Sequence, residues 1–103
     1  MNVCLAMEVD GGGERRFPLT GSTMVLGRDS RCDLRVALPS VALRHCEITV
    51  DGETLKLKDL GSGTGTFHNG TRVEQADLSI DDRLTVGSVT FVVVQMDETT
   101  VSG

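Results

Sequence analysis

The sequence predicts an all-β fold, an antiparallel β-sandwich of roughly ten strands. Apolar residues recur at every second position in several stretches, turn signals separate these stretches, and no segment keeps the period of a helix. The chain has 103 residues, of which 39% are hydrophobic and 24% charged, as is typical of one globular domain. A chain of this size can bury a core without disulfides or bound metal.

Three stretches in the first half of the chain have this alternation. They are residues 3–9, 34–38 and 46–50, and each directs its apolar side chains to one face of a sheet. The dipeptide Asp51-Gly52 then precedes a further alternating stretch at 54–60, so we expect a hairpin there.

The second half of the chain continues the pattern. Asn69-Gly70 and Gly87-Ser88 are turn signals, and residues 84–86 lead into a β-branched run at 89–94 that we expect to be buried on both faces. The polar stretch at 97–103 is interpreted as a tail or the start of a linker. Residues 1–96 are then the single domain.

Two stretches do not fit a strand, and we expect them to form loops at the ends of the sandwich, where binding residues collect. They are residues 39–44, with the sequence P-S-V-A-L-R, and residues 61–65, with the sequence G-S-G-T-G. A nucleotide-binding loop is not expected at 61–65, because a strand is predicted after it and no G-K-[ST] is present.

The charge balance limits the partners. Ten Lys and Arg against fifteen Asp and Glu give a net charge of −5, so nucleic acid and anionic membranes would be repelled and are not expected. Residues 28–46 differ, with four arginines against two aspartates and a local charge of +2. This island suits a compact anion such as one phosphate, and it is also explained as a solvated rim of arginines.

The sequence has no pattern of a metal centre, a disulfide framework or an active site. The three cysteines lack C-x-x-C spacing, and His45 and Cys46 are strand neighbours that point to opposite faces. No Ser-His-Asp grouping or paired carboxylates stand out, so we expect neither an enzyme nor a cofactor. Without a basic leader or a long apolar run, the protein is expected to be cytoplasmic, and the sequon at Asn69 is interpreted as a turn.

Five segments, taken together, resemble the forkhead-associated (FHA) domain family, whose members read phosphothreonine peptides. They occur in the family's order and spacing, and they are Gly27-Arg28, Cys32-Asp33, residues 44–48, residues 59–70 and lastly Asp82-Arg83-Leu84 with Val86-Gly87. The resemblance implies a sandwich of about eleven strands in which loops at one end grip an extended peptide. It also implies a signalling interaction module whose partner is a phosphothreonine-containing protein or peptide.

The resemblance assigns roles to individual residues. Arg28 matches the arginine that the family directs at the phosphate, and a guanidinium fork suits a tetrahedral dianion. Without the resemblance, Arg28 would be explained as an exposed arginine in a turn. Gly27 and His45 match residues that brace the binding loops, and Asn69 and Gly70 are assigned to bracing through their turn.

Two departures from the family pattern predict weakened binding. Ala42 stands where the family has a phosphate-binding serine, and one lost hydrogen bond to a charged group costs about ten- to a hundredfold in affinity. Thr64 stands where the family has an asparagine that holds the peptide backbone, and a hydroxyl supplies only part of that hydrogen bonding.

Four residues of the same loops are candidates to compensate, Ser40 and Ser62 through hydroxyls and Arg31 and Arg44 through charge. Each is equally explained by turn chemistry or by solvent exposure. The alternative function is a degenerate FHA scaffold that binds protein partners without phosphate. In that case the apolar Leu43 at the loop tip would serve the partner.

Overall fold

The computed structural model describes residues 3–9 and 12–95, and the regular structure in them is β-strand throughout. The stretch at 97–103, interpreted above as a tail, lies outside the described residues. In chain order the strands are β1 (Val3–Val9), β2 (Gly13–Pro18), β3 (Thr23–Gly27), β4 (Leu34–Arg35), β5 (Cys46–Asp51), β6 (Thr54–Asp59), β7 (Thr66–His68), β8 (Thr71–Val73), β9 (Gln75–Leu78), β10 (Arg83–Val86) and β11 (Val89–Gln95).

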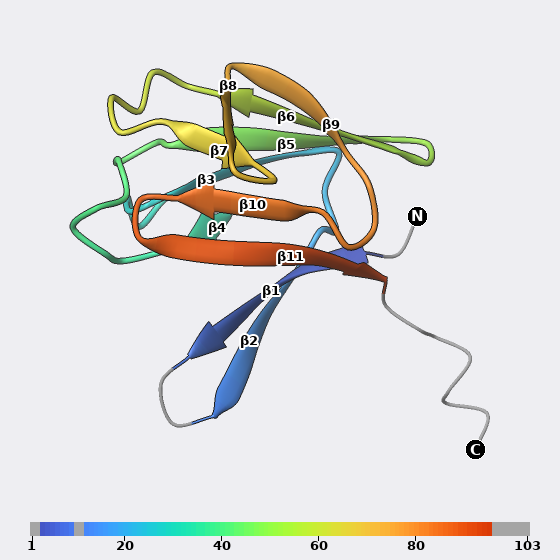
Figure 1. Cartoon of the computed structure of the whole chain (residues 1–103), viewed down its shortest axis with the longest axis horizontal. Coiled ribbons are helices and arrows are strands. Elements are labelled where there is room, and N and C mark those ends of the chain that lie inside the picture. The colour runs from blue at the N-terminus through green and yellow to red at the C-terminus, as the bar shows by residue number, and fades with distance from the viewer. Residues whose placement is uncertain (1–2, 10–11, 96–103) are drawn as a thin grey trace.

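The strands form two sheets that pack face to face (Figure 1). One sheet has the order β2-β1-β11-β10-β7-β8 and the other β4-β3-β5-β6-β9. The β-sandwich predicted from the periodicity is therefore confirmed. Neighbouring strands run antiparallel except β3 and β4, which pair in parallel through Leu26 and Leu34.

The core lies between the sheets and consists of the residues that the alternation places inward. In β6, Leu55 and Leu57 are buried while Lys56 and Lys58 are exposed. Both sheets contribute fully buried side chains, among them Leu5, Leu26, Ile48, Leu84 and Phe91. Because burial of apolar surface is the main stabilising contribution, this core fixes the positions of the strand ends.

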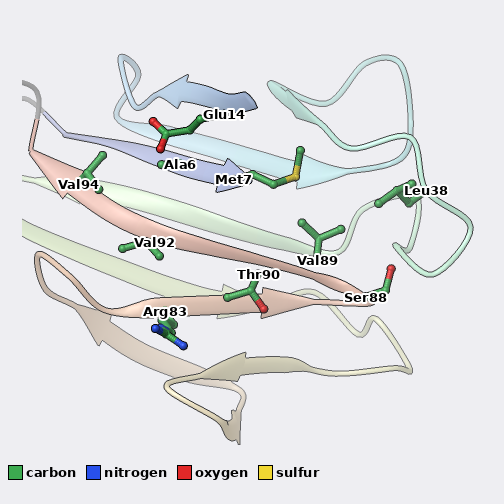
Figure 2. Close-up of a pocket in the computed structure, with 10 residues that line it drawn as sticks. All are labelled: Ala6, Met7, Glu14, Leu38, Arg83, Ser88, Val89, Thr90, Val92 and Val94. Carbon is green, nitrogen blue, oxygen red and sulfur yellow. The ribbon is translucent and has the colours of Figure 1, made fainter. Parts of the chain in front are cut away.

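The run at 89–94 differs from the expectation, since only alternate residues are buried. Val89, Phe91 and Val93 face the core, whereas Val92 and Val94 are half-buried on the outer face of their sheet. A groove of about 970 Å³ runs along β11 on this face (Figure 2). The β-branched residues there fit a pleated surface and do not require burial on both sides.

The β5–β6 and β7–β8 hairpin turns each contain a glycine with positive φ. Asn69 and Gly70 have φ of 51° and 88°, and positive φ at both loop positions is what a type I′ turn requires. The hairpin after β5 is shifted by one residue from the predicted position, because Asp51 still pairs with Thr54. Gly52, with φ of 64°, thereby takes the first loop position, where a two-residue turn favours glycine.

The predicted strand at 34–38 is shorter than expected. β4 ends at Arg35, after which the Val36 amide donates to the Gly27 carbonyl at 2.8 Å and the Leu38 amide donates to the Val36 carbonyl at 3.0 Å. The chain then turns at Pro39 and Ser40, where the Val41 amide donates to the Leu38 carbonyl at 3.0 Å. Pro39 has no N–H for a sheet ladder.

Four connections gather at one end of the sandwich, on the left in Figure 1. They are the β3–β4, β4–β5, β6–β7 and β10–β11 connections, and they include both loops predicted from the sequence. Hydrogen bonds tie them together, from Arg28 to Ala42, from His45 to Gly65 and from Ser88 to Ser40. We call this group of connections the loop end.

Candidate functional site

Arg28 lies at the loop end, directly after β3, and its side chain is exposed. Its Nε donates to the Val41 carbonyl at 3.0 Å, and its amide donates to the Ala42 carbonyl at 2.9 Å. A carbonyl thus orients the guanidinium through Nε, and neither Nη group hydrogen-bonds to a described residue. A preset guanidinium at a loop end is suited to a phosphate.

Gly27 permits this arrangement. A Cβ at this buried position would overlap the Leu43 carbonyl, lying 2.8 Å from its carbon and 3.0 Å from Arg44 Cα. The close approach of β3 to the β4–β5 connection therefore requires a residue without a side chain.

His45 is fully buried and joins two of the loops. Its Nδ1 accepts from the Ala42 amide at 3.1 Å, and its Nε2 contacts the Gly65 carbonyl at 2.8 Å. A carbonyl only accepts, so Nε2 is the donor in this contact. One ring therefore fixes the spacing between the β4–β5 connection and the β6–β7 connection at 60–65, which we call the glycine-rich loop.

Asp59 organises the glycine-rich loop at 60–65. Its carboxylate accepts from the Thr66 hydroxyl at 2.6 Å, from the Ser62 hydroxyl at 2.8 Å and from the Gly61 and Ser62 amides. Burial alone would raise the pKa of Asp59, but the hydrogen bonds from Thr66, Ser62 and Gly61 outweigh it and lower the pKa below its ordinary value. The Ser62 hydroxyl also accepts from the Gly65 amide at 2.9 Å. Its proton is already engaged within the loop.

Ser40 is similarly engaged, against the β10–β11 turn. Its hydroxyl lies 2.9 Å from the Ser88 hydroxyl and accepts from the Ser88 amide at 3.0 Å. A Cβ on Gly87 would lie 2.5 Å from the Ser40 carbonyl oxygen. Ser40 therefore fastens one loop to another.

The two candidate arginines differ. Arg31 pairs with Asp29 at 3.1 Å, and this pair lowers the pKa of Asp29 and raises the pKa of Arg31. Arg44 is exposed and shares with that pair a small pocket of about 240 Å³ that Cys32 also lines. The charge of Arg31 is compensated within the loop, whereas Arg44 makes no salt bridge within 4.0 Å among the described residues.

Of the remaining sequence candidates, Thr64 lies at the loop end, and Asn69 and Gly70 do not. Thr64 is exposed in the glycine-rich loop. Asn69 and Gly70 form the β7–β8 turn at the opposite end of the sandwich, where the Asn69 amide and Oδ1 both bond the backbone of Arg83 at 2.9 and 2.8 Å. The structure therefore places this pair as a brace of β7 on β10, away from the loop end.

Arg72 lies on β8, and its side chain reaches the loop end although no sequence signal in its own segment marked it. Its Nη2 lies 3.4 Å from the Gly63 carbonyl, and a Cβ on Gly65 would lie 2.8 Å from its Nε. The Asn69-Gly70 turn is the signal that could have found it, because the resulting hairpin pairs residue 72 with residue 67, next to the glycine-rich loop.

Other chemistry is limited in the part of the chain that the structure describes. No three His, Cys, Asp or Glu residues there are grouped as metal ligands, and the same residues contain no helix long and apolar enough to cross a membrane. The three cysteines are free thiols, and burial raises the pKa of Cys46 to about 12. The groove of Figure 2 contains neither Arg28 nor the glycine-rich loop.

Comparison with known proteins agrees with this geometry. The FHA domain model matches residues 24–87, and the mouse proliferation marker protein Ki-67 is 35% identical over 65 residues, or 63% of this chain and 2% of that protein. A solved structure from a study of phosphothreonine-dependent FHA domain interactions has a TM-score of 0.83 at 27% identity, covering 94% of this chain and 99% of the other. The solved structure of the FhaA FHA domain complexed with the intracellular domain of Rv3910 has a TM-score of 0.78 at 28% identity. The match covers 88% of this chain and 98% of the other.

FHA domains are protein-interaction modules, and members of the family bind phosphothreonine peptides. The match at 24–87 includes Arg28, His45 and the whole glycine-rich loop, and the fold agrees along nearly the entire described chain. The chain spans only 2% of Ki-67 and 17% of the full-length Mycobacterium tuberculosis protein FhaA, so the likeness concerns this module alone. By sequence model, by fold and by the arrangement of its loops, the chain belongs to the FHA domain family.

Proposed function

We propose that this domain binds phosphothreonine peptides at the loop end, with Arg28 as the phosphate ligand. The observation that carries the proposal is the exposed guanidinium of Arg28, which the Val41 carbonyl orients through Nε at 3.0 Å. Bidentate hydrogen bonds from such a fork are the strong form of phosphate recognition. The affinity of family members for phosphothreonine supports the same assignment.

The loops around Arg28 supply a rigid frame. Gly27 allows β3 to lie against the Leu43 carbonyl, and His45 fixes the glycine-rich loop at a set distance from Ala42. Preorganised loops reduce the entropy cost of binding an extended peptide. In this frame Thr64 is the exposed group of the glycine-rich loop that meets the peptide backbone.

The affinity should be reduced compared with a domain that has serine at position 42. Ala42 offers no hydroxyl to the phosphate, and the hydroxyls of Ser40 and Ser62 are already engaged by Ser88 and Asp59. The positive charge of Arg31 is paired with the carboxylate of Asp29. Arg44 is therefore the candidate that keeps a free charge to compensate.

One observation favours a second function, a phosphate-independent scaffold. Leu43, next to Ala42, exposes 53% of its surface at the loop end. An apolar side chain at this position suits a protein surface better than a phosphopeptide backbone. The two functions share the site and differ in their need for phosphate.

The test is a titration of the domain with a phosphothreonine peptide library and its unphosphorylated twin, followed by fluorescence anisotropy. We expect binding only of phosphorylated peptides, and Arg28→Ala should abolish it in a protein that keeps its melting temperature. Arg83→Ala changes an exposed arginine at the opposite end and serves as the matched control. Equal binding of both libraries, unaffected by Arg28→Ala, would instead support the scaffold.

A further inference from the structure

We infer that Arg72 makes this domain select phosphothreonine peptides that carry an acidic side chain close to the phosphothreonine. The inference rests on the proposed function and adds the chemical class of the sequence next to the phosphate. It is carried by the position of the Arg72 guanidinium, by its free charge and by its relation to Arg28.

The position follows from the β7–β8 hairpin. Arg72 pairs with Phe67, and its side chain returns along the glycine-rich loop to Gly63 and Gly65. A Cβ on Gly65 would lie 2.8 Å from Nε, 3.2 Å from Cζ and 3.3 Å from Cδ of Arg72. Gly65, with φ of 96°, thus leaves the space that the guanidinium occupies.

The charge of Arg72 is not compensated within the described chain. No carboxylate there lies within 4.0 Å of it, in contrast to Arg31 with Asp29 and Arg16 with Glu14. Among the described residues, its side chain makes a single hydrogen bond, the contact of 3.4 Å to the Gly63 carbonyl, at the long end of the range. A guanidinium has five N–H donors, so most of them are available to a bound molecule.

The relation to Arg28 is set by His45. Arg28 bonds to Val41 and Ala42, and the imidazole of His45 joins Ala42 to Gly65, against which Arg72 lies. The two arginines therefore contact the two loops that His45 joins, Arg28 the β4–β5 connection and Arg72 the glycine-rich loop.

The acidic character of the chain makes this charge more selective. With a net charge of −5, the domain as a whole repels acidic peptides. Only local positive charge can reverse this, and Arg72 supplies it beside the glycine-rich loop. The expected ligand is a phosphothreonine segment with Asp or Glu at one flanking position.

The experiment uses phosphothreonine peptides in pairs that carry Glu or Gln at one flanking position at a time. Wild type, Arg72→Gln, Arg72→Lys and the control Arg83→Gln are titrated by fluorescence anisotropy, and melting temperatures are recorded. We expect wild type to prefer Glu at one position by about fivefold, as for an exposed charge pair, and this preference should shrink as salt is raised. Arg72→Gln should abolish the preference and keep the dependence on phosphate, Arg72→Lys should retain part of it, and Arg83→Gln should leave it unchanged.

The outcomes separate the two proposals. A wild-type domain that binds phosphopeptides with no Glu preference, or a preference that survives Arg72→Gln, overturns the role of Arg72 alone. Absence of phosphate-dependent binding overturns the proposed function and the role of Arg72 with it. If Arg72→Gln lowers the melting temperature, Arg72→Lys is titrated with the Glu and Gln peptides. A remaining preference for Glu then indicates a charge contact, because an effect of packing would be the same for both peptides.

Discussion

The imidazole of His45 donates a hydrogen bond of 2.8 Å to the carbonyl oxygen of Gly65, twenty residues later in the chain. Through this bond a fully buried side chain sets the distance between two loops. One is the β4–β5 connection, whose Val41 carbonyl orients Arg28, and the other is the glycine-rich loop, which contains Thr64. The contact links fold stability to the geometry of the site, so a change at His45 should affect both.

His45→Ala should lower the melting temperature and weaken phosphopeptide binding together. Removal of the imidazole leaves the Ala42 amide and the Gly65 carbonyl without partners and opens a cavity. Together these effects should lower the free energy of unfolding by about 2–4 kcal/mol. A loss of this size lowers the melting temperature of a domain this small by roughly 10 °C or more. Differential scanning calorimetry and peptide titration measure the two effects. His45→Gln, which can keep one of the bonds, should be intermediate, and an unchanged melting temperature would remove the bracing role.

Ala42→Ser should raise the affinity for a phosphothreonine peptide about tenfold or more, the worth of one charge-assisted hydrogen bond. The Ala42 backbone already bonds both Arg28 and His45, so the new hydroxyl is added to a fixed segment. Ala37→Ser, an exposed position in the same β4–β5 connection, is the control. Titration at two salt concentrations gives the answer. The same affinity in both serine variants, with no salt dependence, would favour the scaffold.

Asn69→Ala should destabilise the domain more than Asn69→Gly. Asn69 has a φ of 51°, which alanine tolerates poorly, and its Oδ1 accepts from the Arg83 amide at 2.8 Å. Glycine loses only the side-chain bond, whereas alanine loses the bond and adds backbone strain. Chemical denaturation gives the two free energies of unfolding. Because the turn lies away from the loop end, Arg28-dependent binding by the folded fraction should persist in both variants, and its selective loss would show a coupling that we do not expect.

Acid should destabilise the domain partly through Asp59. Its pKa is lowered in the folded state, because the hydrogen bonds from Thr66, Ser62 and Gly61 outweigh the opposing effect of burial. The resulting stabilisation is therefore present above about pH 4, the ordinary pKa of an unfolded aspartate, and is lost as the pH falls through the lower folded pKa. Melting temperatures of Asp59→Asn should be lower than those of wild type at pH 7, and the difference should narrow towards pH 2.5. Asp77→Asn, on the exposed face of β9, is the control. A difference independent of pH would show that the carboxylate charge is not what holds the loop.

The sequence by itself determined the all-β fold class and, in strands such as β6, which face is buried. The alternation of Leu55 and Leu57 with Lys56 and Lys58 needs only the period of a strand, and the Asn69-Gly70 turn needs only the backbone freedom of its two residues. Such local preferences are properties of neighbouring residues. Near Asp51-Gly52, local preference did not fix the position of the turn to within one residue. The pairing of Asp51 with Thr54 places the turn at residues 52 and 53.

Only the tertiary structure decided which side chains of the loop end are free. Ser40 is engaged by Ser88, forty-eight residues later in the chain, and Arg72 comes to lie against Gly65. These contacts depend on the register of β7 with β8 and on how the two sheets pack. Hydrogen bonds between residues twenty or forty-eight positions apart, such as His45 with Gly65 and Ser40 with Ser88, form only once the core has fixed the ends of the strands.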